Sequence, residues 1–80
     1  MRVKVKAVGW LERVFKGSEV VFGFDGDTVK EFLETASKQS GVPLGLDKLI
    51  VLVNGVGVKQ EAFGLKDGDT IMLLPIMSGG

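Results

Sequence analysis

The sequence predicts one α+β domain of two layers, in which a sheet of four to five strands packs on one main helix. Three observations lead to this fold class. The chain has 80 residues, enough for one domain, and its 45% hydrophobic and 25% charged residues are the balance of an ordinary globular protein. Several short segments repeat their apolar residues with period two, as strands do, and one repeats them with the period of a helix. Since one amphipathic helix covers only one face of a sheet, a two-layer domain follows.

Two strands open the chain. Residues 2–7 alternate between basic and apolar side chains, so one face of this strand is expected to be buried. We interpret the basic face, formed by Arg2, Lys4 and Lys6, as a solvated outer surface that discourages pairing at a sheet edge. Residues 19–24 alternate in the same way, and the two strands are predicted to form a hairpin.

The connection between these strands, residues 10–18, forms either a short helical turn or extensions of the strands. Its periodicity does not decide between the two. We expect Trp10 and Phe15, both large and apolar, to belong to the core.

The main helix is predicted from local signals at both ends. Thr28 and Glu31 have the spacing of a capping box, in which each side chain accepts a hydrogen bond from a free backbone N–H group. Gly41 suits the left-handed position after a helix that ends near Ser40, and Pro43 prevents its continuation. The apolar stripe between them consists of Val29, Phe32, Leu33 and Ala36.

The second half of the chain returns to strands. Residues 49–53 are continuously apolar, which predicts an interior strand. Asn54 and Gly55 supply the positive φ angles of a type I′ turn, and residues 56–59 are the predicted returning strand.

A short turn and a last strand complete the predicted domain, which spans residues 1–75. Phe63 and Leu65 are expected to fill the edge of the core, and residues 67–69 to form a turn. The last strand covers residues 70–74 and stops at Pro75, which has no N–H group to donate. Residues 76–80 are predicted to be a flexible C-terminal tail that ends in Gly-Gly.

Composition excludes several classes of function. Ten Lys and Arg offset ten Asp and Glu, so the chain lacks the basic excess typical of nucleic-acid binding. It contains neither Cys nor His, which removes thiolate metal sites and the usual base-activated nucleophiles. We therefore expect no metal site, no bound cofactor and no enzymatic activity of its own. The longest apolar run is far shorter than the roughly 20 residues that cross a bilayer, and no signal-peptide pattern is present, so we expect a cytoplasmic protein without membrane contact.

The end of the last strand is unusual for a monomer. Alternation turns Met72 and Leu74 outward, and two more apolar residues, Ile76 and Met77, follow. They either cap a local core or form a surface that docks on a partner protein. The predicted partner-binding residues are Met72, Leu74, Pro75, Ile76, Met77 and Ser78.

The last two residues, Gly79 and Gly80, are the candidate reactive end of the chain. Glycine has no Cβ, so this dipeptide is able to thread a narrow cleft and to adopt any backbone conformation. A terminal carboxylate is ionised at neutral pH and is able to attack an activated phosphate.

Three sequence blocks occur in a fixed order: Val-Asn-Gly at 53–55, Leu-x-Asp-Gly-Asp at 65–69 and Pro-x-x-Ser-Gly-Gly at 75–80. In these blocks, and over nearly its whole length, the chain resembles the ubiquitin-like β-grasp sulfur carriers (MoaD/ThiS-like proteins), most closely the small subunit of molybdopterin synthase. It departs from them at Leu73-Leu74, where aromatic residues are frequent. The resemblance implies the β-grasp fold, with a mixed sheet on one main helix.

The resemblance also implies a function. An E1-like adenylating enzyme would use ATP to activate the carboxylate of Gly80, and a sulfur donor enzyme would convert the acyl-adenylate to a thiocarboxylate. Docked in the large subunit of molybdopterin synthase, this end would donate sulfur in molybdenum or tungsten cofactor synthesis. Alternatives are sulfur carriage for thiazole or tRNA thiolation, a ubiquitin-like protein modifier, and a non-catalytic interaction module in which Gly-Gly is incidental.

Overall fold

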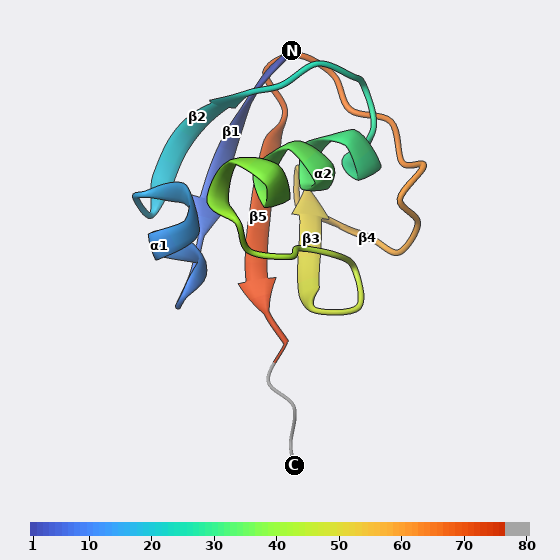
Figure 1. The fold of residues 1–80 in the computed structure, drawn as a ribbon. Coiled ribbons are helices and arrows are strands. Elements are labelled where there is room, and N and C mark those ends of the chain that lie inside the picture. The colour runs from blue at the N-terminus through green and yellow to red at the C-terminus, as the bar shows by residue number, and fades with distance from the viewer. Residues whose placement is uncertain (77–80) are drawn as a thin grey trace.

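A five-stranded sheet is crossed on one face by the helix α2 (Figure 1). The computed structural model describes residues 1–76. Within them the elements are β1 (Arg2–Ala7), α1 (Leu11–Phe15), β2 (Glu19–Gly23), α2 (Val29–Ser40), β3 (Leu49–Val53), β4 (Val56–Val58) and β5 (Thr70–Pro75). The strands lie in the order β2-β1-β5-β3-β4; β1 and β5 are parallel, and all other neighbours are antiparallel. This mixed sheet on one main helix confirms the predicted α+β, ubiquitin-like β-grasp fold.

Helix α2 begins and ends where the local sequence predicts. Thr28 Oγ1 accepts a hydrogen bond from the Glu31 N–H (3.3 Å), and the Glu31 carboxylate accepts one from the Asp27 N–H (3.1 Å). At the other end Gly41 has a φ of 74°, which glycine adopts without steric cost. Neither α2 nor α1 is long and apolar enough to cross a membrane, and the structure describes no other helix. The buried residues of α2 are those of the predicted stripe: Val29, Phe32, Leu33 and Ala36.

The connection that the sequence left open contains the short helix α1. Its Leu11 and Phe15 are buried, and the helix ends at Lys16, which has a φ of 61°. Phe15 therefore belongs to the core as predicted, whereas the prediction for Trp10 is wrong, because this side chain is 43% exposed. Trp10 precedes the helix as its N-cap, and Leu11 and Phe15, four residues apart, form the inward face instead.

Strand β1 lies inside the sheet. It pairs with β2 on one side and with β5 on the other. The prediction that Arg2, Lys4 and Lys6 protect a sheet edge is therefore wrong, although this basic row does lie on the face opposite the buried Val3. Lys4 forms an ion pair with Glu19 of β2 on that outer face (3.3 Å). The parallel partner β5 lies at the other end of the chain, so the local pattern of β1 carries no sign of it.

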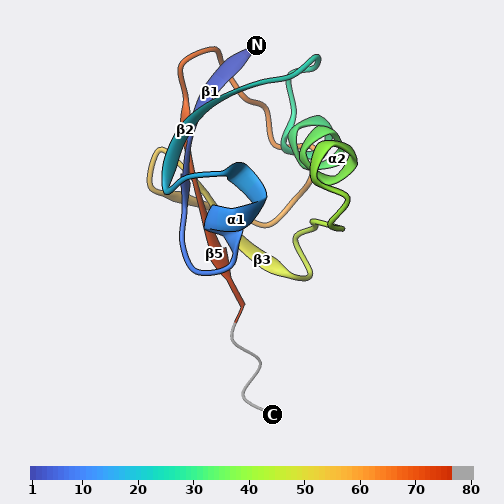
Figure 2. The same cartoon turned by 60° about the vertical axis from the view of Figure 1, so that its left-hand side comes forward.

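Strands β3 and β4 form the predicted hairpin. Asn54 and Gly55 have φ angles of 51° and 84°, as a type I′ turn requires. β3 lies between β5 and β4, which confirms its interior position. Its two faces differ, however: Val51 is buried and Ile50 is 46% exposed. Figure 2 shows the reason, because α2 lies on one side of the sheet only.

The segment between β4 and β5 is fixed by hydrogen bonds to the start of β1. The Arg2 N–H donates to the Asp67 carboxylate (2.7 Å), and the Gly68 N–H donates to the Arg2 carbonyl (2.8 Å). Leu65 is buried as predicted, but the prediction for Phe63 is wrong, because this side chain is exposed. The turn lies at residues 61–62, before Phe63, and of the two apolar residues that follow it Leu65 alone is buried.

Aromatic rings join α1, β2 and α2 on the covered face of the sheet. Phe32 of α2 is fully buried. Phe15 of α1 stacks on it at 6.1 Å between ring centroids, and Phe22 of β2 meets it edge-on at 5.3 Å. Such ring pairs contribute about 0.5–1.5 kcal/mol each beyond their buried area. They fix α1 against the rest of the domain despite its short length.

Candidate functional site

Strand β5 takes the chain out of the domain at the pole opposite the N-terminus (Figure 1). It is a central strand, paired with β1 and β3, so both neighbours fix its direction. Pro75 is its last residue and pairs with Leu49, one residue beyond the predicted strand end. A proline is tolerated there because no further ladder bond is needed from its nitrogen.

Two loops hold the chain where it leaves the sheet. The Ile76 N–H donates a hydrogen bond to the Lys48 carbonyl (3.3 Å). On the other side Gly9, with a φ of 65°, lies so close to Pro75 that a Cβ on it would be 3.3 Å from the proline Cγ. The Val8 N–H also donates to the carbonyl of Leu73 (3.3 Å). The domain therefore determines the direction of the chain up to Ile76.

The outer face of the sheet is apolar beside this exit. Met72 and Leu74 lie opposite the helix-covered face, as the alternation predicts, because their neighbours Ile71 and Leu73 are fully buried. The register pairs Leu74 with Ile50 and Met72 with Leu52 of β3. Directly paired residues share one face, so two apolar rows lie side by side on the open side of the sheet.

We call this region the exit surface. Three of its members are nearly half exposed: Val8 at 44%, Ile50 at 46% and Ile76 at 45%. Met72 and Leu74 are half-buried. The exit surface is formed by Val8, Ile50, Leu52, Met72, Leu74, Pro75 and Ile76.

The structure brings together the predicted site residues that it describes. Met72, Leu74, Pro75 and Ile76 all belong to the exit surface. The other predicted site residues, Met77, Ser78, Gly79 and Gly80, lie outside the described residues, and so does the predicted tail beyond Ile76.

Four exposed or half-buried apolar residues at or near the exit surface escaped the sequence analysis: Val8, Trp10, Ile50 and Leu52. Ile50 and Leu52 were detectable, because a strand that is apolar on both faces has an unexplained face in a two-layer domain. Trp10, which follows the Gly9 that contacts Pro75, gave no signal, since a large aromatic residue is more often buried.

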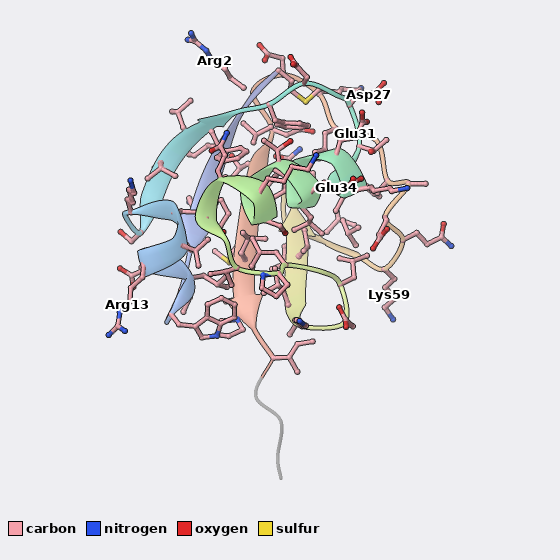
Figure 3. The ribbon with its side chains drawn as sticks, in the orientation of Figure 1. Arg2, Arg13, Asp27, Glu31, Glu34 and Lys59 are labelled. Carbon is pink, nitrogen blue, oxygen red and sulfur yellow. The ribbon has the colours of Figure 1, made fainter. Side chains whose placement is uncertain are left out.

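Two lysines border the exit surface. Lys6 of β1 is the register partner of Met72, and Lys48 binds Ile76 through its backbone carbonyl. The perturbed carboxylate of the domain is elsewhere: Figure 3 places Asp27 and Glu31 beside the start of α2, near the end that holds the N-terminus. Hydrogen bonds from the Asp27 N–H, and next from Thr28, lower the pKa of Glu31 below its ordinary value of 4.5. This shift serves the helix cap, so the described site offers contact and direction rather than acid–base chemistry.

Comparison with known proteins agrees with this geometry. The chain matches the ThiS family over residues 5–80. The small archaeal modifier protein 1 of Haloferax volcanii superposes with a TM-score of 0.76 at 22% identity, over 95% of this chain and 98% of that one. A sequence search of curated proteins gives no significant match.

Two further solved structures are complexes with a second protein. A chain in the complex of subunits 1 and 2 of the molybdopterin-converting factor from Helicobacter pylori is 26% identical, with a TM-score of 0.68 and both chains fully covered. A chain in the BexX/CysO complex of Amycolatopsis orientalis is 27% identical, with a TM-score of 0.67 and coverage of 98% and 99%. The family match includes β5, the exit surface and the Gly-Gly end. The chain therefore belongs to the ThiS family, whose ubiquitin-like sulfur carriers and modifiers act with partner proteins rather than as catalysts.

Proposed function

We propose that this chain is the sulfur carrier of a molybdopterin synthase, and that the carboxylate of Gly80 is the group that carries sulfur. The observation that supports this most is the exit surface, which surrounds the end of β5, because Gly79 and Gly80 follow its last member, Ile76, by three and four residues in the sequence. The Helicobacter pylori complex, described as subunits 1 and 2 of molybdopterin-converting factor, adds support for a synthase large subunit as partner.

The chemistry requires little from this chain itself. A carboxylate oxygen of Gly80 attacks the α-phosphorus of ATP on an E1-like adenylating enzyme, and pyrophosphate leaves. A sulfide ion released by a donor enzyme then attacks the acyl carbon and displaces AMP, which leaves a thiocarboxylate on Gly80. In the synthase large subunit the sulfur passes to a pterin precursor, and water hydrolyses the acyl group of Gly80 back to a carboxylate. Gly79 and Gly80 contribute a slender end that fits a narrow active site, and the partners contribute the acids and bases.

The exit surface supplies the affinity for these partners. Burying a large aliphatic side chain completely is worth about 1.5–3 kcal/mol. Val8, Ile50 and Ile76 still expose nearly half of their surface, so each would contribute about 0.7–1.5 kcal/mol on docking. We assign the same role to Met72, Leu74 and Pro75, which lie among them, and to Met77 and Ser78, which follow.

Mass spectrometry after loading tests the proposal. The chain is incubated with its cognate adenylating enzyme, ATP and a sulfide source, and the intact mass is compared with a chain that lacks Gly80. We expect one oxygen to be replaced by sulfur in the full chain and no change in the shortened one. An unchanged full chain, with an enzyme that turns over ATP in its presence, would reject sulfur carriage.

A second assay distinguishes the pathways. The loaded chain is mixed with the cognate synthase large subunit and a pterin precursor, and formation of the dithiolene product is followed. Transfer to a thiazole precursor or to tRNA instead would retain the carrier role and change the pathway.

A protein modifier is the second candidate, because the chain has the fold of the Haloferax volcanii small archaeal modifier protein 1. In that case, Gly80 would be found in isopeptide bonds to lysine side chains of other proteins. Peptide mass spectrometry of cell extracts that contain the tagged chain detects such bonds. A third possibility, an interaction module, requires that function survive deletion of Gly79 and Gly80.

A further inference from the structure

A second surface lies on the flank of the sheet opposite β4, where α1 lies beside β2 (Figure 1). Side chains of α1, β2 and the end of α2 line a groove there. The groove has a volume of about 440 Å³. Its apolar lining comes from all three elements: Val14 and Phe15 of α1, Val20 and Phe22 of β2, and Ala36 of α2. We call it the β2 groove. It is separate from the exit surface, which lies on β5 and β3 on the other face of the sheet.

The strand beside this groove has a free edge. β2 is the outermost strand of the sheet and has β1 as its neighbour. The Ala7 N–H donates to the Ser18 carbonyl (2.9 Å) and the Phe24 N–H to the Met1 carbonyl (3.0 Å), so Val20 and Phe22 also bond toward β1 in this antiparallel ladder.

The alternate residues of β2 point their backbone groups the other way. Glu19, Val21 and Gly23 therefore direct N–H and C=O groups to the open edge, and no turn or loop hydrogen bond among residues 1–76 uses them. Val21 is also 70% exposed on the outer face of this edge. A free edge without proline or a bulge is a template for another strand.

The charge of the groove selects among possible occupants. Arg13 and Lys16 line it, and no carboxylate does. Figure 3 shows Arg13 extending from α1 away from the domain. The ion pair found among residues 1–76 joins Lys4 to Glu19, so these two cations have no carboxylate partner in the described part of the chain.

Lys16 is unusual in its backbone as well. Its φ of 61° is a conformation that favours glycine, and a lysine there costs about 1–2 kcal/mol. A basic side chain is therefore present beside the groove at a position where local geometry favours glycine.

From the free edge, the apolar floor and the two cations, we propose that the β2 groove binds an extended acidic peptide segment of a partner protein. The segment adds to β2 as a sixth strand of the sheet, with hydrogen bonds to Glu19, Val21 and Gly23. Its apolar side chains enter the groove, and its Asp or Glu residues face Arg13 and Lys16. A second copy of this chain fits less well, because the groove-side residues of β2 itself, Val20 and Phe22, offer no carboxylate.

The test uses three fluorescent peptides and the full chain. The first peptide is Asp-Asp-Ile-Val-Val-Ile, and the second replaces both Asp with Lys. The third keeps the first sequence except that its second Val is replaced by Pro, which removes a backbone N–H group. Binding is measured by anisotropy, and the contacted residues by amide chemical shifts in NMR. We expect only the first peptide to bind, with shifts at Glu19, Val21 and Gly23.

Two variants and one control relate this binding to the groove. Arg13→Glu reverses a charge that lines the groove, and we expect roughly a fivefold to tenfold loss of affinity, as for an exposed ion pair that becomes a repulsion. Val21→Pro removes one outward N–H group and should abolish binding while the bonds from β2 to β1 remain. Arg2→Glu changes the same charge outside the groove and should leave affinity unchanged. If Val21→Pro does not fold, Arg13→Glu and the peptide series remain decisive.

Three results would overturn the proposal. Equal binding of the acidic and basic peptides would remove charge selection. Shifts confined to β3 and β5 would assign the peptide to the exit surface. Concentration-dependent dimerisation that Val21→Pro prevents would make a second copy the occupant of the edge.

Discussion

Replacement of Ile50 tests whether the exit surface docks partners. This residue keeps 46% of its surface exposed in the free chain, so roughly half of the 1.5–3 kcal/mol available from a buried isoleucine, about 0.7–1.4 kcal/mol, remains for docking. Ile50→Ala should therefore weaken partner binding about threefold to tenfold. Ile50→Glu also buries an unpaired carboxylate at a cost of about 1–3 kcal/mol, so its loss should exceed tenfold.

The assay is thiocarboxylate formation by the cognate adenylating enzyme, measured at increasing concentrations of the carrier. Because Ile50 contributes contact and no chemistry, KM should rise while kcat stays unchanged. The matched control is Val56→Glu. Val56 is an exposed aliphatic residue on the neighbouring strand, and it lies with its register partner Val53 on the face of the sheet opposite Ile50. The reasoning fails if Ile50→Glu is loaded like the natural chain, or if Val56→Glu raises KM equally.

Three further predictions concern the scaffold. The pKa of Glu31 is lower in the folded chain than in the unfolded chain. The ionised Glu31 therefore stabilises the fold above its unfolded pKa, and this stabilisation is lost as the pH falls through its folded pKa. Denaturant unfolding from pH 6 to pH 3 (roughly the range around a carboxyl pKa) should show this loss of stability in the natural chain and a smaller loss in Glu31→Gln. Gly26→Ala places a Cβ 2.5 Å from the Glu31 carboxylate, at a φ of 132°, and should lower the free energy of unfolding by about 2–3 kcal/mol. The control is Gly41→Ala, whose new Cβ has no atom within 4 Å and which should cost about 1 kcal/mol. Gly9→Ala, at a φ of 65° and with its Cβ 3.3 Å from Pro75, should lower the free energy of unfolding by about 1–2 kcal/mol and shift the NMR amide signal of Ile76. An unchanged Ile76 signal would mean that Gly9 does not hold the chain where it leaves the sheet.

The parts of the fold that depend on neighbouring residues were predictable. The cap of α2 uses Thr28, Glu31 and Gly41, all within the helix or next to it, and each has the predicted role. The turn at Asn54 and Gly55 is equally local, because its φ angles follow from these two residue types. Local patterns of this kind depend on no distant part of the chain.

The parts that depend on distant pairing were not predictable. The position of β1 inside the sheet follows from its parallel contact with β5, which comes from the other end of the sequence. The exposure of Trp10 follows from where α1 begins, and the exposure of Phe63 follows from the position of the turn at residues 61–62. Hydrophobicity alone assigned both residues to the core.

Part of the candidate site was likewise predictable from local sequence, and part of it was not. The alternation of residues along β5 was enough to predict that Met72 and Leu74 point outward. The extent of the exit surface required the register with β3, which adds Ile50 and Leu52. The β2 groove required three elements to be placed in space, so no single segment of the sequence indicated it.

The most direct test of the account is the chemical state of the last residue. After loading with the adenylating enzyme, ATP and sulfide, the C-terminal peptide is isolated and fragmented in a mass spectrometer. The account predicts that sulfur replaces one oxygen on Gly80 and on no other residue. Sulfur found elsewhere, or a Gly80 that stays a carboxylate while the enzyme consumes ATP, would contradict it.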